Sequence, residues 1–130
     1  MIYEFVQKID ASEVADVFKK SGITRPVDDL DRIQRMVNHA DIIVTARNNG
    51  QLVGIARALT DYSYCCYLSD LAVDAQYQRI GIGKELVRLI QENLGEEVTL
   101  LLVAAPTAIE YYPRIGFEKL DKAFSIKRKR

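Results

Sequence analysis

The sequence has few of the residue types that build metal centres and disulfide frameworks. It contains one histidine, His39, and two cysteines, Cys65 and Cys66, which are adjacent in the chain. Adjacent cysteines cannot form an ordinary disulfide with each other, and no Cys-x-x-Cys or His/Cys cluster has the spacing of metal ligands. We therefore expect no resident metal, and this cysteine usage, together with the missing signal-peptide pattern and membrane-spanning run described below, favours a reducing, cytoplasmic setting.

The sequence also lacks a charge excess and any long apolar run. Eighteen Lys and Arg residues balance eighteen Asp and Glu residues, so no overall basic field attracts nucleic acid or an anionic membrane. The closing Ile-Lys-Arg-Lys-Arg is interpreted as a solvated chain end. No apolar run approaches the roughly 20 residues that span a bilayer, and the first residues lack a signal-peptide pattern. We expect neither a nucleic-acid nor a membrane partner.

Length and pattern predict one domain over residues 1–130. A chain of 130 residues is long enough to bury about two thirds of its unfolded surface, and it contains no linker, repeat or low-complexity tract. Hydrophobic periodicity indicates alternating elements. The predicted strands lie within 3–9 and at 42–46, 52–59, 64–73, 98–103 and 117–127; the predicted helices lie at 11–20, 28–38, 82–94 and 107–112.

The order of these elements predicts the fold class. Asn49-Gly50 is a strong hairpin signal between two strands. The early strands are joined by hairpins, and a strand–helix–strand unit with a parallel crossover follows. The apolar run 98–103 has the composition of a strand buried on both faces. We therefore expect an α/β (α+β) domain with a mixed, mostly antiparallel sheet flanked by helices.

The most informative segment is a glycine loop between a predicted strand and a predicted helix. It reads Gln78-Arg79-Ile80-Gly81-Ile82-Gly83-Lys84. Glycines let the backbone approach a ligand closely, and the helix N-terminus adds unpaired N–H groups and a favourable dipole. The loop lacks the Gly-Lys-Ser/Thr of nucleoside-triphosphate loops, and Leu86 stands where a dinucleotide fingerprint has its third glycine. The segment predicts a phosphate-bearing ligand of another kind.

Two further segments make the pattern more specific. Leu71-Ala72-Val73 precedes the glycine loop, and Tyr111-Tyr112-Pro113-Arg114-Ile115-Gly116-Phe117 follows downstream. In this order and spacing the segments resemble the GNAT superfamily of acyl-CoA-dependent N-acyltransferases, most strongly over 64–117. The resemblance implies a GNAT-like fold and the transfer of an acetyl group from acetyl-CoA, the cosubstrate, directly to a primary amine of an unidentified small molecule or peptide.

The same resemblance assigns the cofactor contacts. The backbone of Leu71, Ala72 and Val73 would pair with the pantetheine arm as an added strand does. The pyrophosphate would lie in the loop formed by Gln78, Arg79, Ile80, Gly81, Ile82, Gly83 and Lys84. Arg79 and Lys84 would add positive charge, although either also reads as a solvated surface residue.

Tyr112 and Asp70 are the predicted catalytic residues. In the family the tyrosine at the position of Tyr112 often lies near the thioester sulfur, and a phenol with a pKa of about 10 can protonate a departing thiolate. A core aromatic is the alternative reading, and Tyr111 is assigned to packing. Asp70 lies where the family often places a carboxylate or a water-holding residue; a structural hydrogen-bond acceptor is the equal alternative. Tyr67 and Ser69 could help to hold a water.

The acceptor site is less well defined by sequence. In this family the loop between the first two helices, here 22–26, commonly forms one wall of it. Arg25 could hold a carboxylate or phosphate of the acceptor, or pair with Asp28 or Asp29. Arg57 is a second cation that could face the site.

Two alternatives stay open. A non-catalytic acyl-CoA sensor or interaction module would keep the glycine loop without an acid or base, whereas a nucleotide-binding module is disfavoured by the missing lysine–hydroxyl pair. The sequence does not fix the oligomeric state. Homodimers that pair through a sheet edge or a helix face are common among proteins resembling this one, and the apolar last strand would serve.

Overall fold

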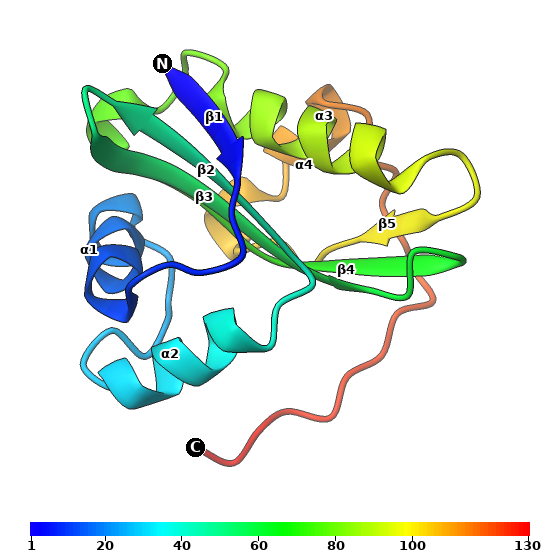
Figure 1. The fold of residues 1–130 in the computed structure, drawn as a ribbon. Helices are drawn as coiled ribbons and strands as arrows, with labels where there is room; N and C mark the ends of the chain where they lie inside the picture. The colour runs from blue at the N-terminus through cyan, green and yellow to red at the C-terminus, as the bar shows by residue number, and fades with distance from the viewer.

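A computed structural model describes residues 1–130 as one mixed sheet of five strands with helices on both sides (Figure 1). The elements in chain order are β1 (Ile2–Phe5), α1 (Ala11–Ser21), α2 (Leu30–Asn38), β2 (Ile42–Asn48), β3 (Gln51–Thr60), β4 (Cys65–Val73), a 3-10 turn (Ala75–Tyr77), α3 (Ile82–Leu94), β5 (Thr99–Leu101), a second 3-10 turn (Pro106–Ala108) and α4 (Tyr111–Arg114).

The strand order β1-β2-β3-β4-β5 follows the chain order. The first four strands pair antiparallel, and β5 pairs parallel to β4 after a crossover through α3. Asn49 and Gly50 form the β2–β3 turn with φ values of +50° and +83°, as a two-residue hairpin requires. The predicted α/β class and mostly antiparallel sheet are confirmed.

Two apolar layers cover the sheet. α1 and α2 pack on one face, where Phe18 and Ile33 are fully buried against Ile55 of the sheet. α3 packs on the other face, where Leu86 and Ile90 are fully buried. The loop that follows β4 lies at the end of the sheet, next to the beginning of α3 (Figure 1).

The beginning of α3 lies unusually close to the sheet. A Cβ atom built on Gly54 of β3 would be 3.0 Å from Cγ2 of Ile82 and 3.4 Å from Cδ1 of Leu86. A side chain at this position would require Ile82 to move by a few tenths of an ångström. Gly54 therefore sets the depth at which the first turn of α3, and the glycine loop in front of it, are held.

The structure corrects the last part of the predicted sheet. β5 has only three residues and one partner strand, so Leu101 and Val103 are exposed, and the expectation of a strand buried on both faces is wrong. The predicted strand at 117–127 does not form, and Phe124 and Ile126 are almost fully exposed. Their apolar side chains find no sheet face to cover, and burial does not offset the entropy of ordering the tail.

The predicted helix at 107–112 is a 3-10 turn followed by the short helix α4. No helix combines the length and the apolar character needed to cross a lipid bilayer.

Candidate active site

The sheet opens between β4 and β5. Only Cys65, Cys66 and Tyr67 of β4 pair with β5, whereas β4 continues to Val73. The rest of the strand, 68–73, is hydrogen-bonded to β3 on one side and leaves the other side without a partner strand. Such an edge presents backbone N–H and C=O groups that can pair with an extended, amide-bearing chain.

The three strand residues predicted to contact the cofactor lie on this open edge. Ala72 is buried in the apolar layer of α1 and α2, while Leu71 and Val73 are half-buried and pack against the α3 layer. Their side chains anchor the strand in both layers of the molecule. What remains for a ligand is the backbone of β4, which is the contribution that the resemblance implies for these residues.

The glycine loop connects this edge to α3. The side-chain amide of Gln78 donates to the backbone carbonyl of Val73 over 2.8 Å. This hydrogen bond links the loop to the end of β4. Arg79 and Gly81 have φ values of +70° and +92°. Glycine adopts such a conformation without strain, but it is unusual for an arginine, and sequence reasoning had no signal for it at Arg79. The chain thereby turns sharply before α3.

The N-terminus of α3 has no side-chain cap. Gly81 occupies the cap position and provides no side-chain acceptor. The first N–H groups of a helix have no partner within the helix, and here the residue type that would satisfy one of them is missing. The uncapped N-terminus of this 13-residue helix is suited to an anion.

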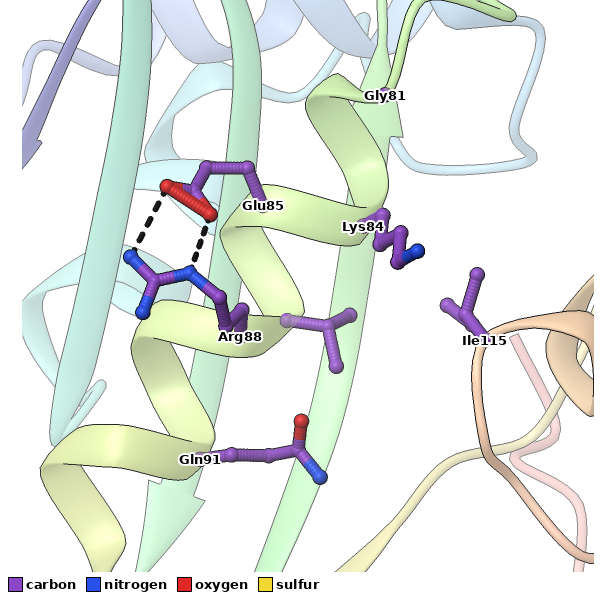
Figure 2. A pocket seen from close by; sticks show the side chains of 7 residues that line it. Gly81, Lys84, Glu85, Arg88, Gln91 and Ile115 are labelled. Atoms are coloured by element: carbon purple, nitrogen blue, oxygen red, sulfur yellow. Dashed lines mark hydrogen bonds and ion pairs between the residues drawn. The ribbon is translucent and has the colours of Figure 1, made fainter.

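Figure 2 shows the hollow beside this helix, which is lined by residues of α3 and by Ile115. Arg88 is engaged there, since it forms ion pairs of 2.5 Å with Glu85 and 2.6 Å with Glu92. Lys84 has no ion-pair partner, and its side chain extends across the hollow towards Ile115. Lys84 is therefore the cation of this surface that is free to meet a negative charge.

Tyr111 approaches the same helix from α4. A Cβ atom on Gly83 would lie 2.9 Å from the hydroxyl oxygen of Tyr111 and 3.9 Å from Cδ2 of Leu71. Gly83 thus leaves room for the phenol over the first turn of α3. The sequence assigned Tyr111 to packing alone; its position over the loop depends on a tertiary contact that no local pattern encodes.

Tyr112 is held by neighbouring aromatic rings. Its ring forms edge-to-face contacts with Tyr111 and Phe117 at centroid distances of 5.3 and 5.5 Å. Burial raises the pKa of the Tyr112 phenol, the adjacent Tyr111 raises it further, and the positive charge of Arg25 opposes the rise. A phenol with a raised pKa keeps its proton at neutral pH, which suits a proton donor.

Asp70 is fully buried between two arginines. One carboxylate oxygen accepts from Nε of Arg25 over 2.5 Å, and the other accepts from Nε of Arg57. Arg25 also donates to the carbonyl of Ser69 over 2.7 Å, and Arg57 donates to its hydroxyl over 2.9 Å. Both oxygens of Asp70 therefore accept from an arginine.

The sequence left open whether Arg25 pairs with a nearby carboxylate, and the structure shows its partner. The arginine binds Asp70, 45 positions along the chain, and pairs with neither Asp28 nor Asp29. Asp29 instead caps the N-terminus of α2. Sequence reasoning named all three members of the network without joining them. The β3–β4 hairpin could have joined two of them, because its register places Arg57 directly opposite Asp70.

Comparison with known proteins agrees with this geometry. Residues 11–127 match the model of the acetyltransferase (GNAT) domain. The match covers most of the chain, so the chain belongs to this family, and the resemblance drawn from the glycine loop and the tyrosine segment is confirmed.

Individual proteins show the same relationship. The chain is 29% identical over 96 residues to the uncharacterized N-acetyltransferase ycf52 of Pyropia yezoensis. This match covers 69% of this chain and 55% of that protein. The chain thus spans about half the length of the curated relatives it matches.

In fold the chain is similar to a GNAT-family acetyltransferase from Streptococcus pneumoniae, with a TM-score of 0.79, 23% identity and coverage of 99% of this chain and 98% of the other. It is also similar to the aminoglycoside N-acetyltransferase AAC(6')-Iy in complex with CoA. That match has a TM-score of 0.73, 17% identity and coverage of 98% and 94%.

Proposed function

We propose that this protein is an N-acetyltransferase that uses acetyl-CoA as cosubstrate and transfers its acetyl group directly to a primary amine of a small molecule or peptide. The observation that carries the proposal is the open edge of β4, which leads through the glycine loop to the uncapped N-terminus of α3. Membership in the GNAT family supports it, and so does the similar fold of an acetyltransferase in complex with CoA.

In this proposal each part of the cofactor meets a matching part of the site. The pantetheine arm pairs with the backbone of 71–73, where β4 lacks a partner strand. The pyrophosphate meets the backbone N–H groups of 78–84 and the helix dipole, and Lys84 supplies a free positive charge.

The proposed chemistry needs one proton donor at the sulfur. The neutral amine attacks the thioester carbonyl carbon, the C–S bond breaks, and the phenol of Tyr112 gives its proton to the departing thiolate. The amine's surplus proton goes to solvent, and solvent returns a proton to Tyr112. Its raised pKa, caused mainly by burial, keeps Tyr112 protonated before the transfer.

Of the two roles predicted for Asp70, we propose the structural one. Its side chain is fully buried and each of its two oxygens accepts from an arginine, so an acceptor amine does not reach it. Asp70 then acts as a positioning residue that joins the loop before α2 to β4. A cytoplasmic location, as expected from the cysteine usage, stays a prediction.

The first experiment is isothermal titration of the protein with acetyl-CoA, with ATP as the control ligand. Saturable binding of acetyl-CoA without comparable binding of ATP is expected. Gly81→Glu adds bulk and negative charge at the cap of α3 and is expected to abolish binding, whereas Gly50→Glu, in the remote β2–β3 turn at a comparable φ, is the control. Equal binding by wild type and Gly81→Glu would remove the loop from the site.

A second candidate function is acyl-CoA sensing without turnover. The pairing of Asp70 with two arginines favours this function, because the predicted carboxylate base is then occupied. The two functions differ in thiol release. Release of CoA with an amine from a broad panel shows transfer, whereas tight acetyl-CoA binding with no release for any amine shows a sensor.

A further inference from the structure

The network formed by Asp70, Arg25 and Arg57 carries a net positive charge. Arg25 and Arg57 contribute two positive charges and Asp70 one negative charge, and no other carboxylate pairs with either arginine. The Arg57 side chain is 8% exposed and the Arg25 side chain 28% exposed. A cation in a largely desolvated position favours a counter-ion. The only member of the network that an incoming anion can reach is Arg25.

The guanidinium of Arg25 is held by hydrogen bonds but still has free donors. A guanidinium has five N–H donors. Three of them have partners: Nε donates to Asp70, Nη1 to the carbonyl of Thr24 over 2.6 Å, and Nη2 to the carbonyl of Ser69 over 2.7 Å. One donor remains on each terminal nitrogen. An arginine held in this way has already lost its side-chain entropy, and its planar fork matches a carboxylate.

An apolar ledge continues from this network along the sheet. Leu59 lies two residues beyond Arg57 on β3 and therefore on the same face. Tyr67 lies opposite Leu59 on β4, and Leu101 lies opposite Tyr67 on β5. Each of these three residues is more than a third exposed. They form a row across three strands that α1 and α2 leave uncovered.

The network also lies within electrostatic reach of the proposed acid. Burial raises the pKa of Tyr112, and the positive charge of Arg25 acts on the same phenol in the opposite direction. A ligand held by Arg25 is therefore in the neighbourhood of the group that would protonate the leaving thiolate.

We propose that the acceptor is a small amine of the amino-acid class, whose carboxylate binds Arg25 and whose apolar part lies on the ledge of Leu59, Tyr67 and Leu101. This inference rests on the proposed function. It disfavours polycationic amines, because the excess positive charge of the network repels them.

The test uses a probe that has the carboxylate and the apolar group but no amine, so that no acetyl transfer takes place. 3-Phenylpropanoate is titrated into the full chain and followed by NMR, with 3-phenylpropanamide as the neutral counterpart. Arg25→Gln removes the proposed contact and leaves Asp70 paired with Arg57. Arg35→Gln removes an exposed arginine of α2 that pairs with no carboxylate, and is the control.

Saturable binding of the carboxylate is expected, at least about tenfold tighter than that of the amide, because a charge-assisted pair is lost in the amide. Arg25→Gln should abolish this difference, Arg35→Gln should leave it unchanged, and Arg25→Lys should recover only part of it. Equal binding of the two probes, no saturable binding of the carboxylate, or an undiminished preference in Arg25→Gln would overturn the inference.

Thermal unfolding of each variant shows whether it is folded. If Arg25→Gln is unfolded, the wild-type comparison of the two probes and the Arg25→Lys variant decide the matter. Acetyl-CoA titration and CoA release test the proposed function separately, so the failure of one proposal is distinguishable from the failure of the other.

Discussion

Gly54 couples the packing of the sheet to the position of the glycine loop, and Gly54→Ala tests this coupling. The added Cβ would lie 3.0 Å from Cγ2 of Ile82 and 3.4 Å from both Cδ1 of Leu86 and Cβ of Ala46. The first distance is tighter than ordinary van der Waals contact. Ile82 is the first residue of α3, so relief of the clash lifts the helix at the end where the anion is proposed to bind.

The expected loss of stability follows from overpacking. Adding a methyl group to a well-packed core costs about 1–3 kcal/mol. A chain of this length changes its Tm by roughly 4 °C per kcal/mol, so Gly54→Ala should lower the Tm by roughly 4–12 °C. Affinity for acetyl-CoA should fall as well, because displaced N–H groups meet the phosphate in poorer geometry.

Thermal unfolding and isothermal titration measure the two effects. Ile82→Ala removes the atom with the closest contact, and the cost of Gly54→Ala should be smaller in that background, with a coupling of about 0.5–3 kcal/mol. Additive effects of the two substitutions, or unchanged Tm and affinity in Gly54→Ala, would refute the idea that this glycine sets the depth of α3.

Three further outcomes are expected. Tyr112→Phe should lower kcat about 100-fold or more with little change in acetyl-CoA affinity, and an unchanged kcat when chemistry limits the rate excludes Tyr112 as the acid. Because burial raises the pKa of this phenol, the fall of the wild-type rate on the alkaline side should lie above about pH 10, whereas the fall on the acid side reports protonation of the amine. Asp70→Asn leaves the buried Arg57 without a full counter-charge and should cost about 3–5 kcal/mol in urea unfolding, whereas Asp28→Asn, which breaks no ion pair, should cost almost nothing. Iodoacetamide should modify exposed Cys65 and spare buried Cys66, whose thiol pKa is raised mainly by burial; mass spectrometry of the folded protein that finds equal labelling contradicts this.

The features predicted from sequence are those that neighbouring residues determine. The β2–β3 hairpin follows from Asn49-Gly50, because few residues adopt the positive φ values that its turn needs. The helix after the glycine loop follows from apolar residues at helical spacing, and Gly95 ends it as expected. The loop itself was recognisable because two glycines stand between a strand and a helix.

The features that sequence reasoning missed depend on contacts between distant segments. Whether an apolar run such as 98–103 is buried on both faces depends on a partner strand, and the tail that follows does not provide one. The pairing of Arg25 with Asp70 bridges 45 positions and competes with two nearer carboxylates, so spacing alone favoured the wrong partners. The position of Tyr111 over Gly83 likewise depends on how α4 packs against α3.

The opening between β4 and β5 makes the lifetime of the folded protein depend on its surroundings. Residues 68–73 of β4 have no partner strand on one side, and a molecule that pairs with this edge binds the native state and not the unfolded chain, so it stabilises the native state. At a concentration one hundred times its Kd, such a ligand adds about 2.7 kcal/mol to the free energy of unfolding. That gain is a large share of the 5–15 kcal/mol typical of a native protein. The abundance of the protein in a cell would then rise and fall with the supply of the molecule that pairs with this edge of the sheet.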